Sequence, residues 1–116
     1  MTFVPLHVHS QFSILDASLS INDLAEKAAL YEMPACALTD HGNLFGAVEF
    51  YKACKEVKVK PLIGCEIYVA PGSRFEKKKE QGVRPSFHLT LIAKNKEGYQ
   101  NLCKLSSCGY LEGFYY

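Results

Sequence analysis

The chain has 116 residues, of which 48% are hydrophobic and 22% are charged. This balance is typical of a soluble α/β domain and excludes disordered and collagen-like classes. The length allows one domain at most, residues 1–116, and the formal net charge of +1 gives no global electrostatic case for nucleic-acid binding.

The cysteines are odd in number, scattered along the chain and mostly set in apolar segments; they are Cys36, Cys54, Cys65, Cys103 and Cys108. This distribution favours reduced, buried thiols in a cytosolic protein. No apolar stretch approaches the roughly 20 residues of a membrane span. The opening MTFVPLHVHS lacks the basic and apolar regions of a signal peptide. We therefore expect a cytoplasmic protein that is not inserted into a membrane.

The apolar runs predict four strands: Phe3–His9, Ala35–Thr39, Pro61–Ala70 and Phe87–Ala93. Between the first two, Ser20 followed by Asp23 predicts a helix start, and Pro34 predicts a helix end near Met33. The spacing of apolar residues predicts a buried helix face made of Ile21, Leu24, Ala25, Ala28 and Tyr31.

Two further helices are expected, one over residues 44–57 with Asn43 as its cap and one over residues 96–107. The core-facing positions of the first should be Ala47, Val48, Tyr51 and Cys54. Those of the second should be Tyr99, Leu102, Cys103 and Ser106. Strand–helix–strand repeats favour parallel pairing with right-handed crossovers, so we expect a parallel sheet or barrel.

A dense basic segment, RFEKKKEQGVR, spans Arg74 to Arg84 and carries five basic residues against Glu76 and Glu80. Charged runs of this kind are usually solvated loops. We expect an exposed segment that is either mobile or hairpin-like and that contributes to DNA contact only as a minor term.

The four histidines all fall in or just after predicted strands. Reactive residues of parallel α/β folds collect at the carboxyl ends of strands. His7 and His9 are two apart on a strand, so both imidazoles project from one face and could share one ion. Hydrogen-bonded structural histidines are the alternative. His41 follows the second strand within TDHG, and His88 interrupts the apolar fourth strand.

Three acidic residues accompany the histidines. Asp16 lies in the loop after the first strand, where it could reach back over the strand end or serve as a turn residue. Asp40 could be a ligand or an acceptor that orients an imidazole, with an ordinary βα turn as the alternative. Glu66 interrupts an apolar run, where a carboxylate needs a partner or a cation unless it lies at an exposed edge.

Imidazole and carboxylate mixtures suit zinc, manganese or iron, and more than four ligands indicate a multinuclear site. In hydrolases, paired metals activate a water molecule and stabilise the phosphate oxygens. The sequence therefore predicts a multinuclear metal site suited to phosphate ester hydrolysis.

Four segments resemble successive motifs of the PHP (polymerase and histidinol phosphatase) domain family: LHVHSQFSILDA, ALTDHGNLFGAVEFY, PLIGCEIYV and FHLTLIAKNKEGYQNLCKLSS. LIAKNKEGYQNL, the start near Met1 and the closing YLEGFYY are similar to the form found in bacterial DNA polymerase III alpha subunits. The resemblance implies an α/β fold, a distorted (β/α)7 barrel with parallel strands. The chain would form its amino-terminal portion, with later strands, remaining ligands and polymerase domains beyond Tyr116.

The resemblance also implies a set of metal ligands: His7, His9, Asp16, His41, Glu66 and His88. We assign Asp40 to the catalytic site as a residue that supports these ligands. The resemblance further implies a part in DNA replication and possible 3′–5′ exonuclease proofreading. The implied partners are DNA and, through the full-length chain, the sliding clamp, the clamp loader and a proofreading subunit.

Two alternatives remain open. One is a metal-stabilised scaffold that organises the polymerase and its proofreading partner without chemistry, and the other is a stand-alone phosphoesterase like histidinol phosphatase. LIAKNKEGYQNL argues against the second. The isolated chain is expected to be prone to aggregation, because an open barrel leaves an unpaired edge. It is also expected to bind metal weakly and to lack activity, because the later ligands of the multinuclear centre are missing.

Overall fold

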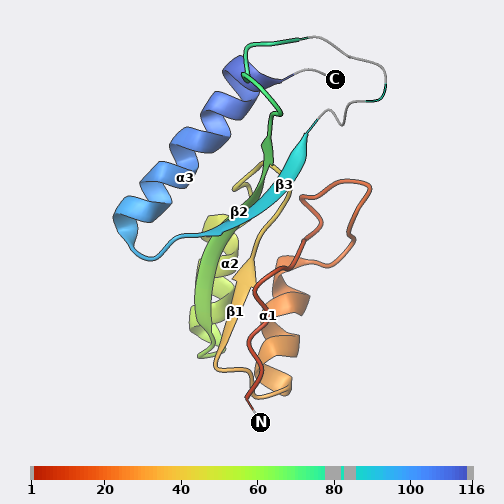
Figure 1. Cartoon of the computed structure of the whole chain (residues 1–116). Helices are drawn as coiled ribbons and strands as arrows, with labels where there is room; N and C mark the ends of the chain where they lie inside the picture. The colour runs from red at the N-terminus through yellow and green to blue at the C-terminus, as the bar shows by residue number, and fades with distance from the viewer. Residues whose placement is uncertain (1, 78–81, 83–85, 115–116) are drawn as a thin grey trace.

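The computed structural model describes residues 2–77, 82 and 86–114. Its main elements are, in chain order, α1 (Ile21–Leu30), β1 (Ala35–Leu38), α2 (Ala47–Glu56), β2 (Lys60–Val69), β3 (Phe87–Ile92) and α3 (Lys96–Cys108) (Figure 1). A π-helical turn, Gly109–Gly113, follows α3. The sheet has the order β1-β2-β3, with β1 parallel to β2 and β3 antiparallel to it. None of the described helices is long and apolar enough to cross a membrane.

Helix α1 begins where its sequence predicts. The Ser20 hydroxyl accepts a hydrogen bond from the Asp23 backbone N–H at 3.1 Å and donates one to the Asp23 carboxylate at 2.6 Å. The helix ends three residues before Met33, because Glu32 adopts a φ of 53° and the Met33 N–H turns back to Ala28 O. Four of the five expected core residues are buried, and Tyr31, which lies beyond the last helical turn, is 64% exposed.

Helix α2 begins at Ala47, with Gly46 as its N-cap residue, and not at residue 44. Asn43 caps a preceding turn instead, since its side-chain oxygen accepts from the Phe45 N–H at 3.1 Å. The buried residues are Ala47, Phe50 and Cys54, whereas the expected core residues Val48 and Tyr51 are exposed. Phe50 was missed because Val48, Phe50 and Tyr51 are all large and apolar, so their spacing alone does not reveal which of them face inward.

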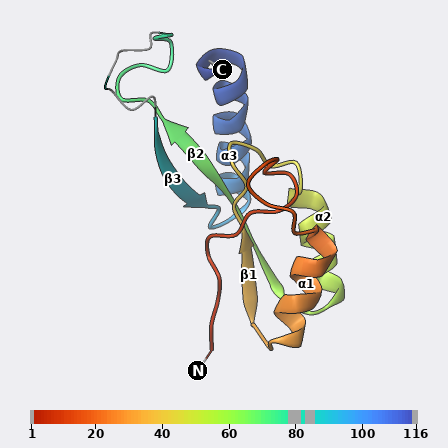
Figure 2. The same ribbon diagram turned by 90° about the vertical axis from the view of Figure 1, so that its right-hand side faces the viewer.

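The core lies where α1 and α2 pack against β1 and the first half of β2 (Figure 2). Its buried members are Ile21, Leu24, Ala25, Ala28, Cys36, Leu38, Phe50, Cys54 and Val59. Gly46 permits this packing, because a Cβ there would come within 2.9 Å of side-chain atoms of both Ile21 and Phe12. The close approach brings the loop before α1 onto the start of α2.

Residues 3–9, expected as a strand, form extended chain beside β1 without becoming a regular strand. The backbone N–H of Ala37 donates to Pro5 O at 2.9 Å, and that of Thr39 donates to Val8 O at 2.8 Å. The ladder is interrupted because Pro5 has no N–H and the Val8 N–H is taken by the Thr39 hydroxyl at 2.9 Å. The segment is nevertheless tied to the edge of β1.

The expectation that all strands are parallel is wrong for β3. Its register with β2 places His88 opposite Tyr68 and Thr90 opposite Glu66 in an antiparallel pair. Antiparallel neighbours need only a loop between them, whereas parallel ones need a crossover, and the described residues between β2 and β3 contain no helix. The α/β class is correct, and closure into a (β/α)7 barrel stays a prediction.

The described part of the basic Arg74–Arg84 segment is largely exposed, as expected; residues 78–81 and 83–85 lie outside the described residues. Arg74 Nε pairs with the Glu112 carboxylate at 2.6 Å, and the Lys77 ammonium donates to the carbonyls of Glu112 and Phe114. These contacts tie the loop after β2 to the turn that follows α3. Helix α3 itself follows the expected bounds and buries Leu102.

Candidate metal centre

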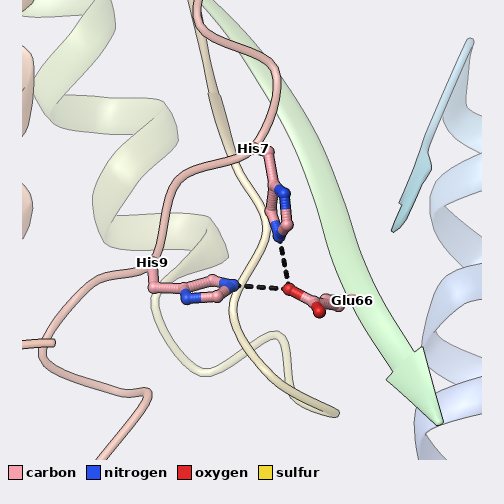
Figure 3. A group of neighbouring side chains, drawn as sticks. All are labelled: His7, His9 and Glu66. Carbon is pink, nitrogen blue, oxygen red and sulfur yellow. Dashed lines mark hydrogen bonds and ion pairs between the residues drawn. The ribbon is translucent and has the colours of Figure 1, made fainter. Parts of the chain in front are cut away.

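All four histidines of the chain gather around the carboxylate of Glu66. The Nε2 atoms of His7 and His9 lie 2.5 and 2.6 Å from the same oxygen, Glu66 Oε2 (Figure 3). His88 Nδ1 lies 2.7 Å from the other oxygen, Oε1. His41 Nδ1 lies 3.8 Å from Oε2. One buried acidic side chain thus connects three segments that are distant in the sequence.

The backbone places these side chains. Beyond the end of β1, His41 forms a parallel bridge with Glu66, held by Glu66 N–H to Asp40 O and Gly42 N–H to Glu66 O, both at 2.9 Å. His88 lies near the start of β3, and because β3 is antiparallel this start is at the same end of the sheet as the carboxyl end of β2. The convergence was predicted correctly, but by a parallel-strand argument that does not apply to His88.

The environment of Glu66 favours its ionised form. Burial would raise the pKa of this carboxyl, but hydrogen bonds from His7, His9 and His88 and the charge of His41 together lower the pKa from 4.5 to about 2. The side chain of Glu66 is only 6% exposed, whereas those of His7 and His88 are about half exposed. The centre is therefore a buried anion with nitrogen donors around it, open to solvent on one side.

The donor set fits a divalent metal. His41 Nδ1 is buried and has no hydrogen-bond partner, although buried polar atoms nearly always have one. Two groups of ligand atoms each lie within 4.8 Å of one another: His7, His9 and Glu66, and His41, Glu66 and His88. Neutral imidazole nitrogens with a carboxylate are the ligands of zinc, manganese and iron sites. A metal at the second group would give the orphaned nitrogen a partner.

Asp16 reaches the edge of this cluster. Its carboxylate oxygen Oδ2 lies 3.3 Å from His41 Nε2, and its side chain is 58% exposed. The structure therefore places all six predicted ligands at one end of the sheet, with Asp16 on the outer side of His41. Their role as metal ligands stays a prediction.

Asp40, expected to orient an imidazole or act in catalysis, contacts other groups. Its side chain is buried and accepts hydrogen bonds from the Ser10 N–H at 2.6 Å, the Ser10 hydroxyl at 2.7 Å and the Ser13 hydroxyl at 2.7 Å. Within the described residues, none of the histidine rings donates to it. Adjacent positions such as 40 and 41 point to opposite sides of an extended chain, which separates Asp40 from the cluster.

Sequence reasoning missed Tyr68. Its ring stacks on His41, with centroids 5.9 Å apart and an 18° angle, and meets His88 edge-on at 4.9 Å. Burial and nearby negative charge, led by Asp16, raise its pKa. Gly42, at φ +63°, leaves room for the ring, because a Cβ there would be 3.3 Å from Tyr68 Cε2. The signal was available, since Tyr68 is two residues from Glu66 on the same strand face.

Solved structures share this fold. The chain superposes on a protein from Chromobacterium violaceum described as an amidohydrolase with a TM-score of 0.62 and 24% identity, covering 87% of this chain and 32% of that one. A provisionally described metal-dependent phosphoesterase from Bifidobacterium adolescentis gives a TM-score of 0.59 and 22% identity, with the same two coverages of 87% and 32%.

Curated sequences are far more similar. The DNA polymerase III subunit alpha of Chlamydia trachomatis is 65% identical over all of this chain. The proteins of the same name from Borreliella burgdorferi and Thermus aquaticus are each 54% identical over 98% and 99% of it. The chain spans only 9 to 10% of the length of these relatives.

A family model described as the PHP domain matches residues 5–116, which include every residue of the candidate metal centre. The match and the geometry agree with the resemblance of the four sequence motifs. The chain belongs to the PHP domain family.

Proposed function

We propose that this chain supplies most of a metal-dependent phosphodiesterase site within a replicative DNA polymerase III alpha subunit. The observation that carries the proposal is the gathering of four histidines around one buried carboxylate, with His41 Nδ1 left without a partner. The identity of 65% to a subunit of that name supports the choice of parent protein. The substrate would be the 3′ end of a DNA strand, and the reaction 3′–5′ exonuclease proofreading.

The metal ligands in this proposal are those assigned from the sequence. Bound zinc, manganese or iron would supply an activated water molecule and positive charge against the phosphate. Glu66 lies between the two donor groups and is the candidate to serve both. It stays ionised because hydrogen-bonded imidazoles outweigh its burial. Tyr68, which lies against His41 and His88, would shape the exposed side of the site.

The setting of the whole protein is part of the same proposal. The parent protein would act in DNA replication in the cytoplasm and would contact DNA, the sliding clamp, the clamp loader and a proofreading subunit. A complete domain would add the remaining ligands and close the (β/α)7 barrel. Exposed apolar side chains on β3, among them Phe87 at 49% and Leu89 at 47%, support such further packing.

The test uses the complete protein, with Glu66→Ala and His9→Ala as variants and Glu49→Ala, exposed on α2, as the matched control. Metal content is measured by mass spectrometry and nuclease activity on a 3′-labelled strand with manganese, zinc or iron. We expect each ligand variant to lose more than about 100-fold in metal affinity and in nuclease rate, exceeding the effect of removing a supporting residue. Polymerisation should be unchanged in all three variants.

A metal-stabilised scaffold is the second candidate, and one observation favours it. The donors come from the amino-terminal segment, the turn after β1, β2 and β3, so a metal would add a direct link between four parts of the chain that are distant in the sequence. Metal binding of this kind contributes directly to folding. Full metal occupancy in the wild type without nuclease activity, and a lower melting temperature for Glu66→Ala, would replace the catalytic proposal with the scaffold.

A further inference from the structure

We propose that Asp40 is a positioning residue that acts through the turn Ser10–Asp16 to hold the Asp16 carboxylate against His41. The proposal rests on the proposed metal site and deepens it, since it assigns to a buried residue outside the ligand set a part in building that set. Three contacts in series carry it: Asp40 to the Ser13 hydroxyl, the Ser13 carbonyl to the Asp16 N–H, and the Asp16 carboxylate to His41 Nε2.

The first contacts are buried. Asp40 and Ser10 are 1% and 0% exposed, and Ser13 is 3% exposed. The carboxylate of Asp40 receives three hydrogen bonds of 2.6 to 2.7 Å from the two serines. Hydrogen bonds to an ionised acceptor are stronger than neutral ones, and a buried carboxylate depends on them. Asp40 is thus an anchor for both ends of the Ser10–Ser13 stretch.

The next contacts connect Ser13, which Asp40 holds, to the backbones of His41 and Asp16. The Ser13 hydroxyl, while donating to Asp40, accepts the His41 backbone N–H at 3.0 Å. The Ser13 carbonyl accepts the backbone N–H groups of Asp16 at 3.0 Å and Ala17 at 3.1 Å. One residue therefore fixes the backbone of His41 on one side and the backbone of Asp16 on the other. The 3.3 Å distance between the Asp16 and His41 side chains follows from this shared support.

The turn is also strained where it is exposed. Leu15 is 100% exposed, so no packing holds it, yet it has a φ of 77° in the left-handed region. Such a conformation is uncommon for a residue other than glycine and persists only where its surroundings impose it. The hydrogen bonds at Ser10 and Ser13, together with the one from the Gln11 N–H to Leu19 O, constrain this turn.

The test is a double-mutant cycle on the manganese affinity of the complete protein, measured by electron paramagnetic resonance, with Asp16→Asn, Asp40→Asn and their combination. If Asp40 acts through Asp16, Asp40→Asn weakens binding about 10–100-fold, the range for residues that support ligands, and the double variant binds no more weakly than Asp16→Asn alone. Losses that multiply would overturn the proposal.

A metal-free measurement separates this proposal from the metal site itself. Asp40→Asn should speed hydrogen exchange at the backbone amides of Ser13, Asp16 and Ala17. Ser13→Ala is a milder variant in case Asp40→Asn does not fold, and it should act in the same direction. Thr39→Val is the matched control, because Thr39 is buried next to Asp40 but its hydroxyl bonds to Val8.

The outcomes are distinct. Unchanged exchange at these amides in both Asp40→Asn and Ser13→Ala, or an equal increase in Thr39→Val, would overturn the positioning role. A wild-type protein that binds no divalent metal would overturn the proposed function, and the exchange rates would still decide whether Asp40 holds the turn.

Discussion

The packed layer, formed by α1, β1 and α2, differs from the open end, formed by Glu66–Val69 of β2 together with β3. Every residue of β1 is buried, and the two helices contribute seven further buried residues in all. At the open end none of the six residues of β3 is fully buried, and the side chain of His88 is about half exposed. Burial in the first region stabilises the fold, whereas exposure in the second leaves the donor atoms accessible.

The two regions meet at the middle of β2. Gly64 lies there with no side chain, and a Cβ would come within 2.5 Å of Leu91 O and 2.8 Å of Thr39 Cγ2. The backbone of β3 and the end of β1 can both approach β2 only because this position is glycine. The difference between the regions shows that the candidate site lies just outside the packed layer, which supports it through β2, the amino-terminal segment and the turn after β1.

The largest expected effect contrasts two phenylalanines. Phe50 in the packed layer is 0% exposed, and Phe87 at the open end is 49% exposed. Phe50→Ala should lower the free energy of unfolding by about 3–5 kcal/mol, through lost burial and a residual cavity. Phe87→Ala should cost less than about 1 kcal/mol. Urea unfolding of both variants measures the difference, and equal losses would show that the two regions are packed alike.

A second prediction concerns acid unfolding of the metal-free protein. The pKa of Glu66 falls from 4.5 to about 2 on folding, so its stabilising contribution is present above about pH 4.5 and is lost as pH falls towards 2. Glu66→Gln should remove up to about 3 kcal/mol of this pH-dependent stability, since one pKa unit corresponds to about 1.4 kcal/mol.

The measurement is urea unfolding between pH 2 and pH 5 in the presence of a chelator. Glu49→Gln, an exposed change on α2, is the control and should follow the wild-type curve. A Glu66→Gln variant whose stability falls with pH as steeply as the wild type would mean that the open end contributes nothing to the acid transition.

A smaller effect is expected at the start of the packed layer. Ser20→Ala removes the hydroxyl that accepts the Asp23 N–H, and loss of such a cap costs about 1 kcal/mol. Ser18→Ala, an exposed change just before the helix, should be close to neutral. Thermal unfolding compares the two. If the packed layer unfolds as one cooperative unit, the residues of the candidate metal centre should lose their structure at the same temperature as α1. This should hold both in the wild type and in Ser20→Ala.

The mildest probe is thiol labelling at pH 8. Burial raises the pKa of Cys36 and Cys65 to about 11, and burial with the neighbouring Cys36 raises that of Cys54 to about 12. Only a small fraction of these thiols is ionised at pH 8, and burial keeps the labelling reagent away from them. Cys103 and Cys108 are only partly buried. Cys103 and Cys108 should react first, then Cys65 at the junction, and Cys36 and Cys54 last. Labelling of Cys54 before Cys65 would show that the packed layer is more accessible than its junction with the open end, contrary to this prediction.

Local patterns predicted much of this molecule. The Ser20–Asp23 pair specified the start of α1, because a cap is satisfied by atoms a few residues away. The two-residue spacing of His7 and His9 indicated that these side chains share a face. Glu66 was recognised because it interrupts an apolar run. A carboxylate in such a run needs a partner, and the structure gives it four histidine neighbours.

Other features depended on groups that are distant in the sequence. The direction of β3 was misassigned because strand polarity depends on how the intervening chain returns, which apolar alternation does not record. The burial of Phe50 in place of Tyr51 follows from how α2 is rotated against β1 and α1.

Composition and short-range spacing thus determined by themselves the α/β class, the existence of three helices and the residue types that could bind a metal. Only the tertiary structure decided that Asp40 turns to Ser10 and Ser13, that Tyr68 lies on the histidines and that His41 Nδ1 has no partner. The physical reason is range. Caps and alternation are satisfied within a few residues, but a buried polar atom is satisfied by whatever group folding brings next to it, and that group lies tens of residues away.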